Sequence, residues 1–421
     1  LYAGVIAVPI PELDPMRAKR GRPRFRSIAK DSQASTLLTT KKLFTGEATH
    51  LEEFPEISSM RRIFVEESLH DYSTNGSNKE VKHQQEIAFL QYTSGSTSSP
   101  KGVIVTQQCL LQQLKALVQT CGLQKESIAL TWMPHFHDYG LVSGLLLNVF
   151  LGIPTYVMAP TRFLRHPLVW LQAITKHQVT HSSGPNFAYE LCVKRSQPQE
   201  RVGLHLREWC FATCGAEPIR VETMESFTRA FEPFGFNKHS FSPAYGLAEF
   251  TLAASIKPHG SIPSHLELDA HHLEKGSIVP AQTPTGLSRK VVSCGYPIPK
   301  TDIRIIDDKT HRRVSDNKIG EIWLNGPSMT QGYWQQSEKT QKTFHAYTAD
   351  TGEGPFLRTG DLGFINNGQL YVTGRLKDLI IIRGNNYFPQ DIEQTVQESH
   401  QAFRPGTSVA FSLSEASEER L

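Results

Sequence analysis

The sequence predicts an α/β fold in which layered sheets and helices form a large N-terminal core and a smaller, β-rich part follows. Up to about residue 258, short apolar runs rich in β-branched residues alternate with helical patterns, as they do in layered sheet-and-helix proteins. Residues 258–290 are rich in Pro, Gly, Ser and His, and the β-rich segments after them suggest an antiparallel unit. A chain of 421 residues exceeds what one core usually supports, so two or three domains are expected.

The elements of the first part follow from these patterns. Strands are expected at 86–93 and 102–106, and the loop between them should join them as a hairpin. A helix should begin at Gln107 and end before Gly122, because glycine commonly closes a helix. Further strands are predicted at 127–134 and 154–159, with helices at 139–151, 166–180 and 219–235.

In the second part the pattern predicts strands at 302–307, 319–326, 368–374, 379–384 and 407–413, and a helix at 391–399.

Composition argues against several classes of function. With 44 Lys plus Arg against 41 Asp plus Glu, the net charge of +3 does not suggest a nucleic-acid binder. The basic stretch Met16–Arg26 contains Pro and Gly; it could contact nucleic acid or anionic lipid, but a solvated loop is favoured. No charged residue occurs from Tyr139 to Thr161, but Gly152 and Pro154 interrupt this run, so a buried helix and strand are favoured over an integral membrane segment. The six cysteines form no CxxC pair, which is typical of reduced thiols in a cytoplasmic protein.

The stretch "QYTSGSTSSPKGV", Gln91–Val103, indicates an anion site. It differs from a Walker A loop because Pro100 replaces the second glycine, Val103 replaces Ser or Thr, and a strand rather than a helix follows. Loop hydroxyls and backbone N–H groups could wrap phosphates, and Lys101 would add a positive charge. The candidate phosphate-binding residues of this loop are Thr93, Ser94, Gly95, Ser96 and Thr97.

The segment "WMPHFHDYG" brings His135, His137 and Asp138 together. A zinc site is disfavoured because Tyr139 stands where the pattern of binuclear hydrolases has Asp. A hydrogen-bonded core histidine is the simple alternative to a functional one.

Two short motifs could bind a nucleoside. In "CGAEP", Gly215 and Ala216 are small enough for a flat base to approach the backbone, with Glu217 beside them. In "AYGLAE", Tyr245 offers a ring for stacking, Gly246 permits a tight turn, and Glu249 could hold Mg²⁺ through oxygen contacts. Further on, "RTGDLG" places Asp361 where its carboxylate could accept hydrogen bonds from two ribose hydroxyls, and Arg375 follows in "GRLKD".

This ordered set of motifs resembles the adenylate-forming (ANL) superfamily of acyl-CoA synthetases, luciferase-like ligases and adenylation domains. The resemblance implies an adenylation core over 1–376 with an incomplete N-terminus, and a hinge with the start of a small α+β C-terminal domain over 377–421. It implies that ATP and Mg²⁺ are used, that Lys101, His137 and Glu249 serve catalysis, and that Lys377 is the hinge. His137 would lie beside the carboxylate substrate, and Arg375 would reach the ribose or the α-phosphate.

Within the superfamily, "YGLAEFTLAAS" and "GNNYFPQDIE" resemble the fatty acyl-AMP ligase branch. That branch implies a fatty acid substrate, transfer to the phosphopantetheine arm of an acyl carrier protein, and an insertion within 258–291 that restrains domain rotation. The superfamily's late C-terminal lysine should lie beyond residue 421, since no Lys follows Lys377. A CoA-forming fatty acid ligase, an amino-acid-activating domain and a non-catalytic nucleotide-binding module of a synthase remain as alternatives.

Overall fold

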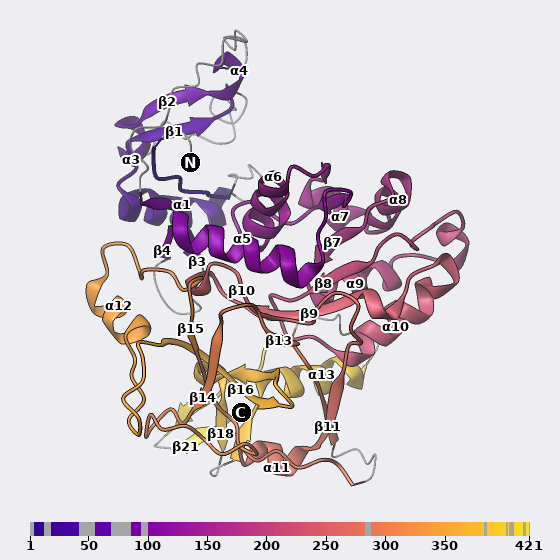
Figure 1. The fold of residues 1–421 in the computed structure, drawn as a ribbon, viewed down its shortest axis with the longest axis vertical. Helices are drawn as coiled ribbons and strands as arrows, with labels where there is room; N and C mark the ends of the chain where they lie inside the picture. Colours follow the sequence, from indigo (N-terminus) through magenta and orange to yellow (C-terminus); the bar gives the residue numbers. More distant parts are fainter. Residues whose placement is uncertain are drawn as a thin grey trace.

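The computed structural model describes residues 4–11, 18–41, 55–68, 86–93, 100–282, 288–382, 385–400, 403, 408–415 and 418–420. Its centre is a seven-stranded sheet of order β13-β10-β9-β8-β7-β5-β6 (Figure 1). The pairs from β6 to β9 are parallel, while β10 and β13 add antiparallel strands at the other edge. The strands are β5 Ala129–Thr131, β6 Thr155–Val157, β7 His181–Gly184, β8 Phe211–Cys214, β9 Phe241–Gly246, β10 Ala253–Ile256 and β13 Tyr296–Pro297.

Helices connect these strands, as the α/β alternation predicted. A cluster of buried aromatic side chains, including Trp170, Trp209 and Phe227, fills the space between the sheet and its helices. The helices are the π-helix η3 Tyr139–Leu146, α6 Leu147–Leu151, α7 Pro160–Arg165, α8 Leu168–His177, α9 Asn186–Lys194 and α10 Val221–Phe231, with 3₁₀ turns η4 Pro198–Arg201, η5 Glu232–Phe234, η6 Lys238–Ser240 and η7 Ala248–Phe250.

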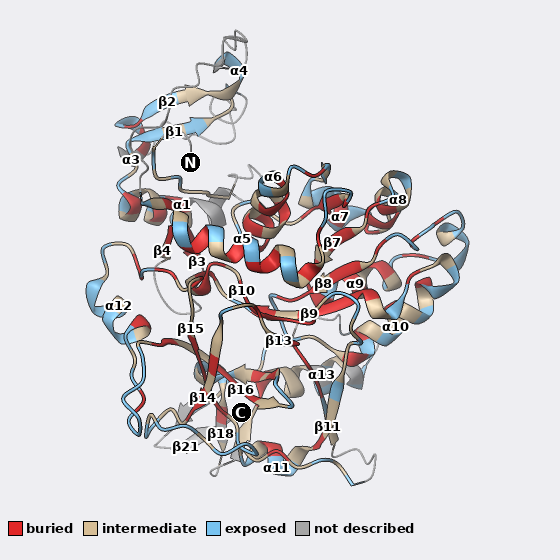
Figure 2. Ribbon diagram, viewed as in Figure 1, coloured by how far each residue is buried: buried red, intermediate tan, exposed pale blue. Residues whose placement is uncertain are grey.

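The predicted hairpin and the helix after it are confirmed. Strands β3 (Ile87–Thr93) and β4 (Lys101–Thr106) pair antiparallel, and Thr93 lies opposite Lys101 at the end of the described ladder. Helix α5 (Gln107–Cys121) begins at the capping side chain of Thr106 and ends at Gly122, whose φ of 66° is the left-handed conformation that glycine adopts without strain. Figure 2 shows that α5 is buried on one side and exposed on the other.

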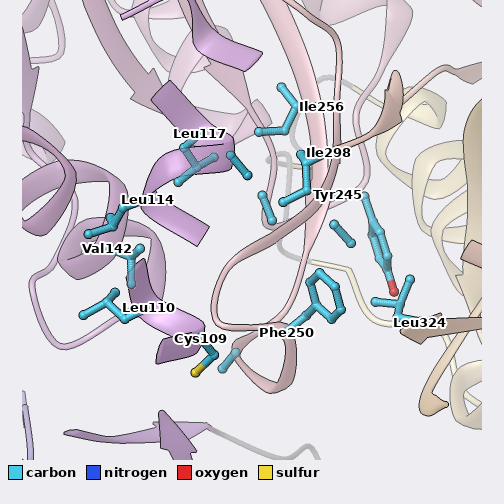
Figure 3. Close-up of a cluster of buried hydrophobic side chains, with 14 of the residues drawn as sticks. Cys109, Leu110, Leu114, Leu117, Val142, Tyr245, Phe250, Ile256, Ile298 and Leu324 are labelled. Carbon is cyan, nitrogen blue, oxygen red and sulfur yellow. The ribbon is translucent and has the colours of Figure 1, made fainter. Parts of the chain in front are cut away.

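The buried side of α5 forms part of the main core. Leu110 and Leu114 lie beside Val142 of η3, and with Leu117 and Phe250 they belong to one buried apolar cluster (Figure 3). This core also includes residues of the antiparallel sheet, such as Leu324. The hairpin, the central sheet and the β-rich part are therefore held together by one continuous apolar cluster.

The β-rich part predicted from the sequence is a four-stranded antiparallel sheet of order β14-β15-β16-β17. Its strands and the helix inserted before β16 are β14 Asp302–Ile306, β15 Gly320–Asn325, α12 Ser337–Phe344, β16 Leu357–Asn366 and β17 Gln369–Arg375.

Residues 265–269 and 288–292 form a separate antiparallel pair that packs beside this sheet. β11 pairs with β12, and a small core joins Leu268, Leu273 and Val291 to Phe388 near the C-terminal end of the chain. The elements of this region and of the C-terminal segment are β11 His265–Asp269, α11 Ala270–Glu274, β12 Ser288–Val292, η8 Leu376–Asp378, β18 Ile380–Ile382, β19 Asn385–Tyr387, α13 Pro389–Ser399, β20 Leu413–Glu415 and β21 Glu418–Arg420.

The interpretation of Met16–Arg26 as a solvated loop is wrong for its described residues. Ala18–Ser32 form helix α1, because Phe25 and Ile28 provide an apolar face that is buried. The other N-terminal elements are β1 Thr36–Thr39, α3 Pro55–Ser58, β2 Arg61–Phe64 and α4 Val65–Ser68, with β1 parallel to β2.

Three further details differ from or qualify the prediction. The helix expected at 139–151 consists of a π-helical segment and a short α-helix, and Gly144 fits where a Cβ would crowd the side chain of Thr131. The strand expected at 407–413 is wrong for 408–412, which are irregular; only Leu413 belongs to a strand, β20. No helix among the described residues is long and apolar enough to cross a membrane.

Candidate active site

A cavity of about 710 Å³ brings most of the predicted site residues together. It lies between the β3–β4 hairpin, the segment before η3, the ends of β8 and β9, and the β16–β17 region. The predicted residues that line it are Thr93, Lys101, His137, Gly215, Ala216, Tyr245, Gly246, Glu249, Arg375 and Lys377. Ser94, Gly95, Ser96 and Thr97 lie outside the described residues.

Glu249 and Lys101 both line the cavity, and Tyr333 contacts both of them. The hydroxyl of Tyr333 donates to Glu249 Oε1 at 2.8 Å, and Lys101 Nζ lies 4.6 Å from the centre of the Tyr333 ring. Burial raises the pKa of Glu249, although Tyr333 and Lys101 favour its charged form. Burial lowers the pKa of Lys101, while Glu249 opposes this. Electrostatic coupling therefore joins the lysine and the carboxylate before any ligand is bound.

Asp361 does not line the cavity, although the sequence analysis predicted that its carboxylate would accept hydrogen bonds from the ribose. It is buried behind the cavity surface, where its Oδ2 accepts from the Tyr245 hydroxyl and its Oδ1 accepts from Arg375 Nε, both at 2.8 Å. Asp361 chiefly raises the pKa of Arg375, and burial raises the pKa of Asp361 itself. The carboxylate thus holds two cavity residues in position.

The backbone of the "RTGDLG" motif is held by a second buried carboxylate. Glu321 accepts from Arg358 Nη2 at 2.8 Å and from the backbone N–H of Gly360 at 3.1 Å. Gly360 has a φ of 71°, and no atom lies near the position its Cβ would take, so the glycine is needed for its conformation rather than for space. This turn leads directly to Asp361.

Close backbone approach explains two of the small residues. A Cβ on Gly246 would overlap the carbonyl oxygen of Leu252, and a Cβ on Gly215 would lie 2.9 Å from the carbonyl oxygen of Ala244. The neighbouring Glu217 does not line the cavity. Its Oε1 accepts from the backbone N–H of Phe187 at the start of α9.

His137 is positioned by the residue that follows it. Its Nδ1 lies 2.6 Å from Asp138 Oδ1, and the same oxygen accepts from the N–H of Tyr139 at the start of η3. The hydrogen bond with Asp138 raises the pKa of His137, and Arg24 acts in the opposite direction. Among the described residues no group of three or more His, Cys, Asp and Glu side chains gathers as a metal site, so the histidine segment gains no support as a zinc site.

The other end of the cavity is largely apolar. It is formed by Leu117, Leu123, Leu147, Phe211 and Ile256. His181 also lines it, and because its burial lowers its pKa to about 4, it is neutral at physiological pH. A cavity that is charged at one end and apolar at the other fits a ligand with a charged head and a hydrocarbon tail.

The sequence analysis missed Tyr333 and Arg24. Tyr333 follows Gly332 in "QGYW", a motif that gave no sign of its contact with Glu249. Arg24 lies in the basic stretch interpreted as a loop, yet it lines the cavity. Its buried Nε has no hydrogen-bond partner, and the described residues offer it no ion pair.

Comparison with known proteins agrees with this site. The model of the AMP-binding enzyme family matches residues 1–334. Medium-chain-fatty-acid–[acyl-carrier-protein] ligase JamA of Moorena producens (strain JHB) is 47% identical over all of this chain and 72% of its own length. Long-chain-fatty-acid–AMP ligase FadD26 of Mycobacterium marinum (strain ATCC BAA-535 / M) is 34% identical over 94% of this chain and 69% of its own length.

Solved structures give the same result. The fatty acyl-adenylate ligase from L. pneumophila, determined in complex with acyl adenylate and pyrophosphate, matches with a TM-score of 0.80 and 38% identity over 99% of this chain and 71% of that one. The α/β fold is confirmed by this match. Taken with the site geometry, these comparisons show that the chain belongs to the AMP-binding enzyme family.

Proposed function

We propose that this chain activates a fatty acid with ATP, releases pyrophosphate, and passes the acyl group to the phosphopantetheine thiol of an acyl carrier protein. The observation that carries the proposal is the single cavity with cationic groups at one end and an apolar lining at the other. The names of the fatty-acid ligase relatives, two of which specify an acyl carrier protein, support the same reading.

In the first step a carboxylate oxygen of the fatty acid attacks the α-phosphorus of ATP, and the bond to the departing pyrophosphate breaks. No protein nucleophile is required, so the protein acts by positioning and by neutralising charge. Lys101 and the loop after Thr93 would hold the departing pyrophosphate. Tyr245 and Arg375, oriented by Asp361, would fix the nucleoside, and His137 would shape the carboxylate site.

Glu249 would hold Mg²⁺. A half-buried carboxylate that faces the cavity suits a metal which usually keeps few protein ligands and binds the substrate's phosphates. Bound there, Mg²⁺ would supply positive charge against the phosphate oxygens. Burial, which disfavours the carboxylate anion, would be offset by that charge.

We further propose the two-part organisation of 1–376 and 377–421, with the β11–β12 pair as the branch-specific insertion. Arg289 of β12 supports this: its Nη1 lies 3.2 Å from Asp391 Oδ2, and its guanidinium lies 4.6 Å from the ring centre of Phe388. The insertion thereby contacts the segment after Lys377, which would rotate if the chain used CoA.

The test is pyrophosphate release by the full-length protein with ATP, Mg²⁺ and a mixed fatty-acid pool, with mass spectrometry of the adenylate. Lys101→Ala should lower the rate of release, and Asp361→Ala should chiefly raise the Kd for ATP. Absence of fatty-acid-dependent release would refute the proposal and favour a non-catalytic nucleotide-binding module. Offering the isolated acyl-adenylate to CoA or to a holo carrier protein then decides between the two acceptors.

A further inference from the structure

The segment that follows the active-site histidine has an unusual charge distribution. From Tyr139 to Tyr189 the sequence contains no Asp or Glu, yet it contains Arg162, Arg165 and Lys176. All three side chains are exposed, and within the described part of the chain none of them forms an ion pair with a carboxylate. This region therefore presents positive charge that the protein itself does not neutralise.

Large apolar side chains are exposed in the same region. Val149 is 78% exposed, Val157 69% and Leu164 45%, and Phe150 and Tyr156 are exposed to 41% and 40%. All five fall within sixteen residues of sequence, on α6, β6 and α7. We call this set, together with Arg162 and Arg165, the α6–α7 surface.

These elements lie at an edge of the described structure. β6 is the edge strand of the central sheet and pairs only with β5 among the described strands. Helices α6 and α7 lie along the outer border of the molecule in Figure 1, and blue, exposed residues mark both in Figure 2. Exposed apolar groups concentrated in one region usually indicate an interaction site.

The α6–α7 surface also lies next to the apolar end of the cavity. Leu147 and Asn148 of α6 line the cavity, while the next two residues of the same helix, Val149 and Phe150, are exposed. One short helix thus separates the proposed acyl site from the outer surface.

We propose that the α6–α7 surface docks reversibly on an anionic lipid bilayer. Aliphatic and aromatic tips would enter the headgroup region, and the arginines would pair with lipid phosphates. The absence of Asp and Glu from residues 139–189 favours a uniformly negative surface over a protein partner, whose interface usually mixes both signs of charge. This proposal does not depend on the adenylation reaction.

The test is flotation of the purified protein with phosphatidylglycerol-containing vesicles and, separately, with pure phosphatidylcholine vesicles. Binding should be strong only to the anionic vesicles and should weaken as salt is added. At about 1 kcal/mol for each basic residue near the membrane, Arg162→Gln/Arg165→Gln should lower the partition constant roughly thirtyfold. Val149→Asp/Val157→Asp should abolish binding.

Matched controls are available elsewhere on the surface. Arg312→Gln/Arg313→Gln removes two exposed arginines, and Val202→Asp changes a valine that is 77% exposed, both outside the α6–α7 surface. These variants should bind vesicles as the unaltered protein does. No binding of the unaltered protein to anionic vesicles, or equal losses in the control variants, would overturn the proposal. So would a result in which the arginine variant binds vesicles normally but transfers its acyl group to a carrier protein more slowly.

Discussion

At the residue scale, a hydrogen bond from a residue distant in sequence opposes the effect of burial on the proposed magnesium ligand. Burial raises the pKa of Glu249, and the hydroxyl of Tyr333 lowers it by bonding to the carboxylate. Glu249 is useful to a cation only when deprotonated, so activity should fall as pH decreases through its raised pKa. The acid limb of the pH–rate profile should therefore report this group.

Tyr333→Phe tests that assignment. Losing a hydrogen bond to a charged group should raise the pKa of Glu249 further and move the acid limb about one pH unit upward. The measurement is kcat/KM for ATP against pH, with Tyr371→Phe as a control at a buried tyrosine away from the cavity. An unchanged acid limb in Tyr333→Phe would show that another group controls it.

A second prediction at this scale concerns Arg24 and His137. Arg24 lowers the pKa of His137 because two positive charges repel each other. Arg24→Gln should therefore raise the pKa of His137, which an NMR titration of the imidazole would measure. Arg26→Gln, an exposed position on the same helix, should leave that titration unchanged. A fall in the pKa of His137 in Arg24→Gln would contradict the arrangement.

The residue scale also shows where sequence reasoning succeeds and where it stops. Lys101, Glu249 and Asp361 belong to compact motifs whose residue types suggest their chemistry, and the fold brings Lys101 and Glu249 to one cavity. The carboxylate of Asp361 accepts hydrogen bonds from Tyr245 and Arg375. Tyr245 and Asp361 are 116 positions apart, so no local sequence pattern predicts their contact. Arg24 was missed because the basic composition of its segment suggested a loop. The segment instead forms a helix, one face of which brings Arg24 to the cavity.

At the element scale, the strand β12 connects the proposed insertion to the C-terminal segment. Arg289 contacts Asp391 and Phe388 on that segment, and its Nη2 donates to the carbonyl oxygen of Thr373 on β17. Since the contacts with Asp391 and Phe388 would be lost if the C-terminal segment rotated, while the bond to Thr373 holds Arg289 to the core, the strand should oppose rotation. The resemblance to the fatty acyl-AMP ligase branch implied an insertion within 258–291, but only the packing shows which residue of this region contacts the C-terminal segment.

Arg289→Ala should therefore release the C-terminal segment. If rotation is what CoA use requires, transfer from the acyl-adenylate to CoA should increase about tenfold, as expected for the loss of roughly 1.4 kcal/mol of restraint. Lys290→Ala is the matched control, because the neighbouring Lys290 pairs with Glu222 of α10 instead. Equal rates of CoA transfer in both variants would argue against a restraint at β12.

At the scale of the whole molecule, alternation of strands and helices was enough to predict the layered fold, and the order of motifs to predict one shared cleft. The sequence could not predict which side chains pack together to join the layers. One core cluster extends from Leu110 on α5 to Leu324 on β15, and those contacts join segments more than two hundred positions apart. The π-helical start of the 139–151 helix was not predicted either, and nor was the close packing of its Gly144 against Thr131 of β5.

The same fused core predicts how stability depends on alkaline pH. All six cysteines are free, and burial raises the pKa of five of their thiols, namely those of Cys121, Cys192, Cys210, Cys214 and Cys294. For Cys121 and Cys294 the native pKa is about 12 against an ordinary value of 9.0. Between these two values the unfolded chain has lost protons that the native protein retains, so deprotonation favours unfolding.

The contribution of these thiols to the free energy of unfolding should thus be fully present below about pH 9 and should be lost above it. Each such thiol lowers the free energy of unfolding by about 1.4 kcal/mol per pH unit. Lys257, whose native pKa burial lowers to about 8, works in the opposite direction, and so does Lys101, whose pKa burial also lowers, but they are two groups against five. Chemical denaturation at a series of alkaline pH values measures the slope, and Cys121→Ala/Cys294→Ala should make it shallower at some cost in packing. A free energy of unfolding that stays constant or rises between pH 9 and 11 would show that these thiols are not shielded from water as the fold requires.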